Sequence, residues 1–272
     1  MDLKININFG LSIILKYYYI FEQLINRNLV NKIFVSIDRD VLNHYRNDSD
    51  NNYYQNYIIF LKHINIHSRI IIENSYNKTY QNICVNELSR VCHIPIKFKL
   101  YDKLIYKNPI YEYDYVTIST KLLNIDNNLY EKYKNILFNK LNNIGYKVIL
   151  LGEKRITDCK EYQIHNTYSI YDDLIKNLDN YIDNTIESNN NNNDLESFMT
   201  SATILNKSKL NIYMSNGGIS ILLCYISTNI VGLINTNLVD KALLDKTSYL
   251  HDCSNIKISN NFKDFLQNIK VE

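Results

Sequence analysis

The sequence predicts an α/β protein made of two Rossmann-like halves, each built on a parallel sheet. Two observations predict this class. Short, continuously apolar runs, typical of buried parallel strands, alternate with longer segments of helical periodicity. Polar clusters also follow several of the apolar runs, and the carboxyl ends of parallel strands are where open α/β sheets bind ligands.

The first half begins with a strand, a helix and a second strand. Leu3 to Asn8 alternates apolar and polar residues, and Phe9 to Ser12 turns into an apolar helix over Ile13 to Ile25. The next strand covers Lys32 to Ile37 and ends at the polar Asp38-Arg39-Asp40.

Three more elements and a linker follow. We expect a helix over Tyr54 to Leu61, a strand over Ser68 to Ile72 and a helix over Tyr80 to Val91. The two prolines, Pro95 and Pro109, bracket an irregular stretch. This predicts an N-terminal domain over residues 1–100 and a C-terminal domain over residues 110–272.

The second half repeats the alternation. Asp114 to Thr120 is a strand, and Leu129 to Ile144 is a helix that Gly145 ends as a C′ glycine. Lys147 to Leu151 is a buried-type strand that leads into Gly152-Glu153. The remaining predicted elements are helices over 169–178 and 195–207, a strand over 209–213, a helix over 219–225, a strand over 230–234 and a terminal helix over 260–269.

Composition narrows the classes of function. With 46% hydrophobic and 21% charged residues the chain can bury a core, and its net charge of +2 is spread without the basic stripe of a nucleic-acid-binding protein. No apolar run is long enough for a transmembrane segment. The five cysteines are widely spaced, which indicates reduced thiols and a cytoplasmic protein, with peripheral work at a membrane left open.

The most informative stretch is Ser215-Asn216-Gly217-Gly218, between an apolar strand and an apolar helix. The chain has only 6 glycines, and an adjacent pair at such a turn lets the backbone approach a ligand closely. The N–H groups at the start of the following helix would then face an anion. We therefore expect a phosphorylated ligand here.

Four short motifs of the second half occur in a recognisable order. They are Ser119-Thr120-Lys121 after a strand, Val148 to Glu153, the Ser-Asn-Gly-Gly turn at 215–218, and Val231-Gly232-Leu233-Ile234. In order and spacing they are similar to the donor domain of GT-B glycosyltransferases, nearest to the heptosyltransferase-like family that builds surface polysaccharide. Ile7 to Ile13 likewise resembles that family's opening Gly-x-Gly-Asp loop, which lies beside the acceptor.

The resemblance implies two Rossmann-like domains facing a cleft, in the GT-B manner, and a nucleotide-diphosphate sugar as donor. It implies that the end of one strand contacts phosphate and that the end of the next contacts the nucleoside, with Glu153 accepting hydrogen bonds from the ribose. It also implies that the glycine turn presents backbone N–H donors to the diphosphate. The residues implied in these roles are Ser119, Thr120 and Lys121, then Gly152 and Glu153, then Ser215, Asn216, Gly217 and Gly218.

The sequence departs from the family at its proposed catalytic base. Ser12 stands at about the position of the family's acidic residue, and a serine needs help to act as a base at neutral pH. Either Asp38 or Asp40 serves instead, or the chain is not a competent transferase. Asn216 also replaces a frequent aspartate, which removes repulsion toward phosphate.

The leading expectation is therefore a metal-independent hexosyl or heptosyl transfer from a nucleotide sugar to a glycan or lipid-linked acceptor. No cofactor beyond the donor is expected. Asp38-Arg39-Asp40 has the Asp-x-Asp pattern of a metal site, but it lies in the N-terminal half, away from the predicted donor turn. Two alternatives stay open. One is a non-catalytic binding or assembly protein of the same fold, and the other is an enzyme resembling a nucleotide-sugar epimerase. The oligomeric state, the sugar and the nucleotide are not predicted.

Overall fold

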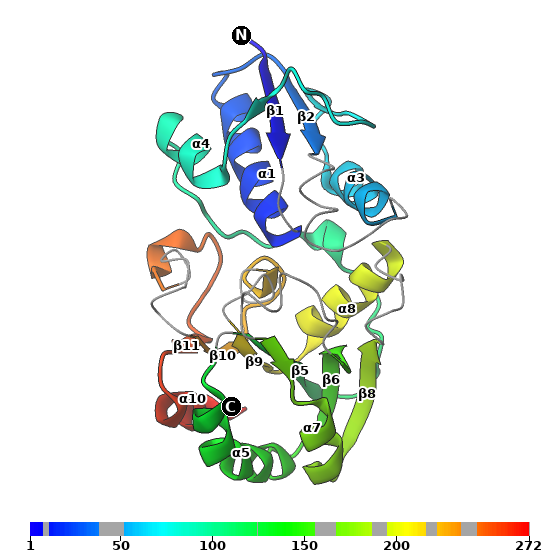
Figure 1. The fold of residues 1–272 in the computed structure, drawn as a ribbon, viewed down its shortest axis with the longest axis vertical. Helices are drawn as coiled ribbons and strands as arrows, with labels where there is room; N and C mark the ends of the chain where they lie inside the picture. The colour runs from blue at the N-terminus through cyan, green and yellow to red at the C-terminus, as the bar shows by residue number, and fades with distance from the viewer. Residues whose placement is uncertain are drawn as a thin grey trace.

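The computed structural model describes residues 1–7, 11–37, 52–123, 125–155, 167–186, 195–215, 222–234 and 244–271. These residues form an α/β structure with one sheet in each half of the chain, and the halves follow one another along the long axis of the molecule (Figure 1). The predicted α/β class with two parallel-strand sheets is confirmed. Within the described ranges, no helix is long and apolar enough to cross a membrane.

The N-terminal sheet has four strands in the order β3-β2-β1-β4. Each described pairing in it is parallel. This is the order 3-2-1-4 with which a doubly wound Rossmann sheet begins. Its strands and helices are β1 (Leu3–Ile7), α1 (Leu11–Asn26), β2 (Ile33–Ile37), α3 (Asn52–Ile64), β3 (Ile70–Ile72), β4 (Gln81–Asn82) and α4 (Val85–Val91).

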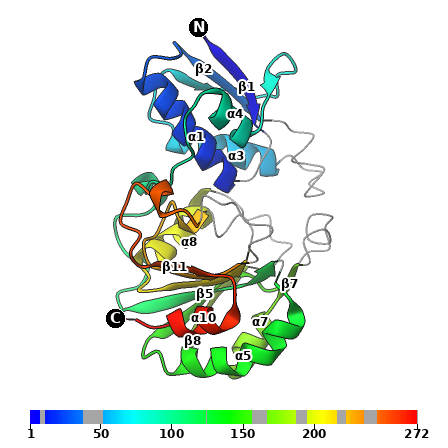
Figure 2. The same ribbon diagram turned by 90° about the vertical axis from the view of Figure 1, so that its left-hand side faces the viewer.

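Helix α1 lies inside the molecule, since most of its residues are apolar and even its charged Lys16 and Glu22 are buried. Tyr17, Tyr18 and Tyr19 along it are all buried. The Tyr17 hydroxyl donates to the Ile83 carbonyl at 2.6 Å, and the Tyr18 hydroxyl donates to Asn65 Oδ1 at 2.9 Å. A helix with so few polar residues belongs to the core of a protein. Figure 2 shows α1 beside the N-terminal sheet, with its first turns nearest the C-terminal half.

The C-terminal sheet has the order β11-β10-β9-β5-β6-β8, and β7 pairs with the end of β5 in the antiparallel sense. By chain position the six parallel strands read 6-5-4-1-2-3, which is the full Rossmann order. Its switch point, where successive strands are added on opposite sides, falls between β5 and β9. The elements are β5 (Tyr115–Leu123), α5 (Asn127–Asn142), β6 (Lys147–Glu153), β7 (Thr167–Ser169), α7 (Tyr171–Asn177), β8 (Tyr181–Ile186), α8 (Leu195–Lys207), β9 (Asn211–Ser215), β10 (Ile230–Leu233), β11 (Ile256–Ser259) and α10 (Phe262–Asn268).

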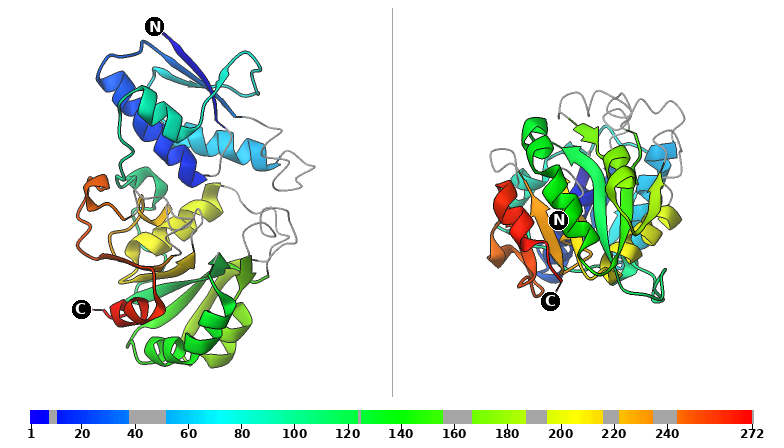
Figure 3. Two further views of the ribbon diagram at one scale, coloured as in Figure 1. Left: turned by 60° about the vertical axis from the view of Figure 1, so that its left-hand side comes forward. Right: turned by 90° about the horizontal axis from the view of Figure 1, so that it is seen from below.

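The two faces of this sheet pack into different apolar clusters. Alternate strand residues such as Val116, Leu150 and Met214 pack with α5, α7 and α10 on one face. On the other face, residues such as Leu151 and Tyr213 join a cluster that includes α8 and continues into the core of the N-terminal half. The views in Figure 3 show α5 and α10 beneath the sheet and α8 on the side of the N-terminal half.

Several predicted elements need correction. The helix predicted over Tyr80 to Val91 is wrong in its first turn, because Gln81 and Asn82 pair with β1 as β4 and the helix begins at Val85. Strands β8 and β11 were not predicted. Strand β8 lies at an edge of the sheet, and its Tyr181-Ile182-Asp183-Asn184 sequence lacks the continuous apolar character of a central strand.

The stretch predicted as a linker packs against both halves, and Lys99 within it pairs with Glu22 of α1. Phe98 forms a β-bridge with Tyr249, and the Tyr101 N–H donates to the Tyr225 carbonyl at 3.1 Å. A short 3₁₀ helix, η1 (Asp102–Leu104), follows, and Leu104 is fully buried. These contacts anchor the connection rather than leaving it loose.

Candidate functional site

The switch point of the C-terminal sheet contains an irregularity in β5. Thr117 pairs with Asn211 and Ile118 with Ile212, but the next pair joins Leu122 to Met214. Three residues of β5, Ser119 to Lys121, therefore stand opposite the single residue Tyr213 of β9. Bulges of this kind redirect side chains and are frequent beside active sites. The bulge coincides with the segment that the sequence predicts to contact phosphate.

Thr120 and Gly152 hold the ends of β5 and β6 together. Thr120 is fully buried, and its hydroxyl lies 2.9 Å from the carbonyl oxygen of Glu153 and 3.2 Å from that of Leu151. Gly152 has a φ of +113°, and a Cβ there would lie 2.8 Å from the Thr120 hydroxyl oxygen. The Thr120 hydroxyl is thus used within the protein, while Gly152 permits the close approach of the two strands.

Lys121 and Glu153 are brought together at these strand ends. Lys121 Nζ lies 3.5 Å from Glu153 Oε2, and the two side chains are 20% and 16% exposed. The Ser119 hydroxyl oxygen accepts from the Lys121 N–H at 3.4 Å. The predicted phosphate lysine and the predicted ribose carboxylate therefore lie side by side. An arriving anion would compete with Glu153 for the lysine.

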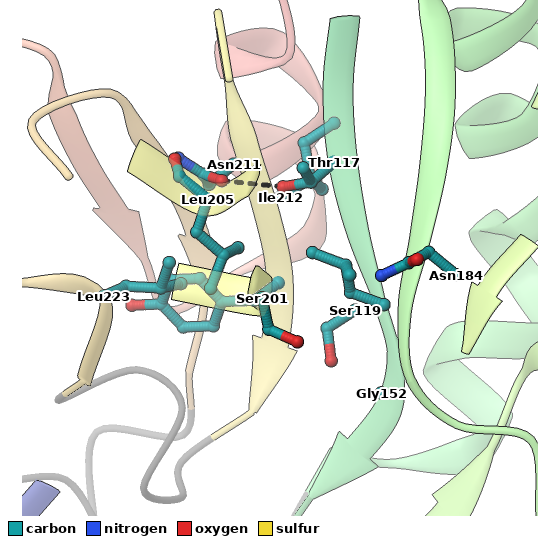
Figure 4. Close-up of a pocket in the computed structure, with 11 residues that line it drawn as sticks. Thr117, Ser119, Gly152, Asn184, Ser201, Leu205, Asn211, Ile212 and Leu223 are labelled. Atoms are coloured by element: carbon teal, nitrogen blue, oxygen red, sulfur yellow. Dashed lines mark hydrogen bonds between the residues drawn. The ribbon is translucent and has the colours of Figure 1, made fainter. Parts of the chain in front are cut away.

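A cavity of about 170 Å³ lies on the α8 side of the sheet, and Ser119 and Gly152 are among the residues that line it. Ser119 of β5 pairs with Leu151 of β6, which pairs with Asn184 of β8, so their side chains form a row on one face. Ser201 of α8 lies across from this row. Figure 4 shows the hydroxyls of Ser119 and Ser201 and the Asn184 amide directed into the space they line.

Asn184 and Ser201 were missed by sequence reasoning. Asn184 is on the edge strand that was not predicted, and Ser201 was predicted only as part of a helix. Neither carries a motif; the strand order brings Asn184 into the row of Ser119, and the packing of α8 on the sheet brings Ser201 to the cavity. No local signal in the sequence could have found them.

The inner wall of the cavity is a buried hydrogen-bond network. Thr117 donates its hydroxyl hydrogen to Asn211 Oδ1 at 2.7 Å (dashed in Figure 4). Asn211 Nδ2 lies within 3.1 Å of three acceptors, the Leu205 and Asn229 carbonyls and the Ser227 hydroxyl. Thr117 and Asn211 are each 1% exposed. Because these groups are satisfied internally, the network stabilises the wall.

The other predicted site residues are placed only in part. Ser215 is buried at the end of β9, next to Leu123 of β5, which puts it at the switch point with Ser119. Ser12 lies in the first turn of α1, but its side chain is outside the described residues. Asp38, Asp40, Asn216, Gly217 and Gly218 also lie outside them.

The strand ends of the N-terminal sheet carry a polar network of their own. The Ser36 hydroxyl of β2 donates to Asn6 Oδ1 of β1, and Asn6 Nδ2 donates to the carbonyls of Asn77 and Tyr80 at 3.0 and 3.1 Å. Asn6 and Ser36 are fully buried. The network fastens the segment that leads into β4, which is a structural role.

Comparison with known proteins supplies no relative. Neither protein-family models nor curated proteins nor solved structures match this chain. Among the described residues, no three His, Cys, Asp or Glu side chains gather as a metal site would require. The function must therefore be argued from the site itself.

Proposed function

We propose that this protein transfers a sugar from a nucleotide-diphosphate donor to a glycan or lipid-linked acceptor, and that its two halves bind donor and acceptor separately, as in GT-B enzymes. The C-terminal half binds the donor, and the N-terminal half presents the acceptor. One observation carries the proposal. In a sheet with the full Rossmann order, Lys121 lies beside Ser119 on β5 and pairs with Glu153 of β6, and Ser215 of β9 pairs with Leu123 across the switch point.

The chemistry of these residues suits such a donor. A switch point is where open α/β sheets bind nucleotides. Lysine is a good point charge for phosphate, and Glu153 at the neighbouring strand end can accept from ribose hydroxyls. The Ser119 hydroxyl adds a neutral donor beside Lys121.

The proposed mechanism stabilises the leaving group. As the bond between the sugar and the diphosphate breaks, negative charge grows on the departing diphosphate. A positive charge and backbone N–H groups already aimed at this position lower the barrier. In this mechanism Lys121 supplies the charge, the Asn216–Gly218 turn supplies the N–H groups, and Asp38 or Asp40 takes the proton from the acceptor hydroxyl.

The donor site is tested by calorimetric titration with a panel of nucleoside diphosphates. We expect one of them to bind, and Lys121→Ala to weaken its binding by about tenfold or more, the usual cost of a lost hydrogen bond to a charged group. Lys209→Ala is the matched control, because Lys209 is an exposed lysine that pairs with Asp114 at the opposite end of β5. If none of the panel binds, or if both variants bind equally well, the proposal fails.

Turnover is tested separately from binding. Asp38→Asn and Asp40→Asn should each be assayed for sugar transfer with the donor that binds. Loss of transfer with donor affinity retained supports a catalytic base at that position. Full transfer by both variants would place the base elsewhere, and binding without any transfer by the unaltered protein would favour the non-catalytic alternative that Ser12 suggests.

A further inference from the structure

The cavity beside the switch point is ring-sized. Its volume is about 170 Å³, comparable with an apolar cavity of about 150 Å³ that accommodates benzene. Ligand pockets for whole drug-sized molecules span roughly 300–1,000 Å³. The described part of the cavity therefore matches one ring of a nucleotide sugar rather than the whole molecule.

The described lining of the cavity is uncharged, and a charged pair lies nearby along the same two strands. The described residues that line it are apolar, hydroxyl or amide side chains and one glycine, and none is ionisable at neutral pH. Lys121 lies two residues beyond Ser119 on β5, and Glu153 directly follows Gly152 at the end of β6. Because burying an unpaired charge is costly, a phosphate belongs at the lysine and an uncharged ring belongs inside.

The walls favour a flat aromatic ring. Leu205 of α8, Leu223, Leu151 and Tyr213 are among the residues that line the cavity. The hydroxyls around a sugar ring would meet these apolar walls without partners, whereas the faces of a nucleobase need none. Polar groups at a few fixed points in an apolar pocket are the arrangement that orients such a ligand.

Asn184 is placed to read one edge of that ring. It stands two strands from Ser119 in the same row, which separates their Cα atoms by about 10 Å at the usual strand spacing. A base fits across this span with room for a hydrogen bond at its edge. An amide offers both a donor and an acceptor, and asparagine pairs in this way with base edges.

We propose that the cavity holds the base of the nucleotide and that Asn184 determines which base is accepted. This inference rests on the proposed function, because the bound molecule is taken to be a nucleoside diphosphate. It adds a subsite and a specificity residue on β8 that the strand-end motifs do not contain. Ser201, across the cavity on α8, bounds the space for the ring.

The test compares four sets of ligands by calorimetry. The first is the diphosphates of uridine, cytidine, adenosine and guanosine, and the second is the corresponding nucleosides. The third is inorganic pyrophosphate and the fourth is ribose 5-phosphate. We expect one diphosphate to bind at least tenfold tighter than pyrophosphate and than the other three diphosphates. Ser201→Leu should fill the cavity and reduce this diphosphate to the affinity of pyrophosphate. Thr200→Leu is the control, since it adds similar bulk to α8 one residue earlier without lining the cavity.

Asn184→Ser provides a second variant that leaves the cavity open. It should reduce the preference for one base at least tenfold and leave pyrophosphate binding unchanged. Thermal unfolding of each variant establishes that it is folded.

The outcomes separate this inference from the proposed function. If the diphosphates bind through Lys121 but all bases bind equally, or if Ser201→Leu changes nothing, the base subsite is refuted while a phosphate site stands. A second outcome is that a nucleoside binds, that Ser201→Leu abolishes this binding, and that the nucleoside diphosphate binds no tighter than the nucleoside. In that case the base subsite stands and the transferase proposal fails.

Discussion

At the scale of single residues, the backbone conformation of Gly152 lets two strand ends meet. Its φ of +113° is left-handed, and Thr120 occupies the space that a side chain would need. Glycine is the residue that adopts such a conformation without steric cost. Gly152 lines the cavity and directly precedes Glu153 of the ion pair with Lys121, so its geometry bears on both.

Gly152→Ala should destabilise the protein by about 2 kcal/mol or more, through a strained φ and a clash with the Thr120 hydroxyl. Gly145→Ala is the control, because Gly145 has a φ of +81° with nothing within 4 Å of an added Cβ. Urea unfolding of both variants separates backbone strain from the contact. Equal losses would contradict a role for the contact.

His251 makes the stability of the folded protein depend on pH. Burial lowers its pKa, and the backbone of Phe98 and the charge of Asp252 offset this only in part. In an unfolded chain histidine titrates near pH 6.5. As pH falls below this value the unfolded state therefore binds a proton that the folded state resists, and stability decreases until the pH passes the folded pKa.

We expect the free energy of unfolding to drop as pH falls from about 7 to 5, and His251→Gln to lessen that drop. Urea unfolding of both proteins at several pH values measures the difference. A variant that loses stability in parallel with the unaltered protein would contradict the role of His251.

At the scale of elements, the hydrogen bonds of Asn211 hold β9 beside β5. Asn211 accepts from Thr117 on β5 and donates to Leu205 at the end of α8 and to the Ser227–Asn229 segment. One buried side chain thus ties together the strands of the switch point and the helix above them. The bulge at Ser119 begins two residues after Thr117.

Asn211→Leu should cost about 3 kcal/mol, because it leaves several buried polar groups without a partner. Thr117→Val removes only one of these bonds and should cost less. The double variant tests their coupling, since residues joined by a hydrogen bond are not additive in unfolding free energy. Additive losses would show that the two side chains act independently.

At the scale of the whole molecule, the two halves share one apolar core. The cluster that contains Ile5 and Tyr17 of the N-terminal half also contains Leu151 and Tyr213 of the C-terminal sheet. Phe60 of α3 packs edge-to-face on Phe198 of α8, with ring centroids 5.1 Å apart. Interfaces between independent domains are usually smaller and more polar than a continuous core.

The protein should consequently unfold in one cooperative transition. Calorimetry should show a single peak, and Phe198→Ala should move the whole peak to lower temperature. A fragment of residues 1–100 should fail to fold alone, because it would expose the face of α3 that packs on α8. Two separate transitions, or a stable fragment, would contradict a shared core.

Much of this architecture could be predicted because periodicity is a local property of the chain. Apolar runs and helical spacing placed α1, β2, α8 and β10 within a few residues of their observed bounds. The polar residues at the ends of β5 and β6 were likewise visible in the sequence. The predicted helix start at Tyr80 was wrong, because pairing with β1 outweighs local helical preference for Gln81 and Asn82.

The sequence by itself determined the α/β class, most of the elements and the strand-end residues Ser119, Lys121 and Glu153. Only the tertiary structure decided the strand order, the β5 bulge, the pairing of Lys121 with Glu153 and the arrival of Asn184 at the cavity. The physical reason is distance along the chain. An edge strand such as β8 acquires its place from packing and from hydrogen bonds to β6, and neither leaves a periodic pattern in its own six residues.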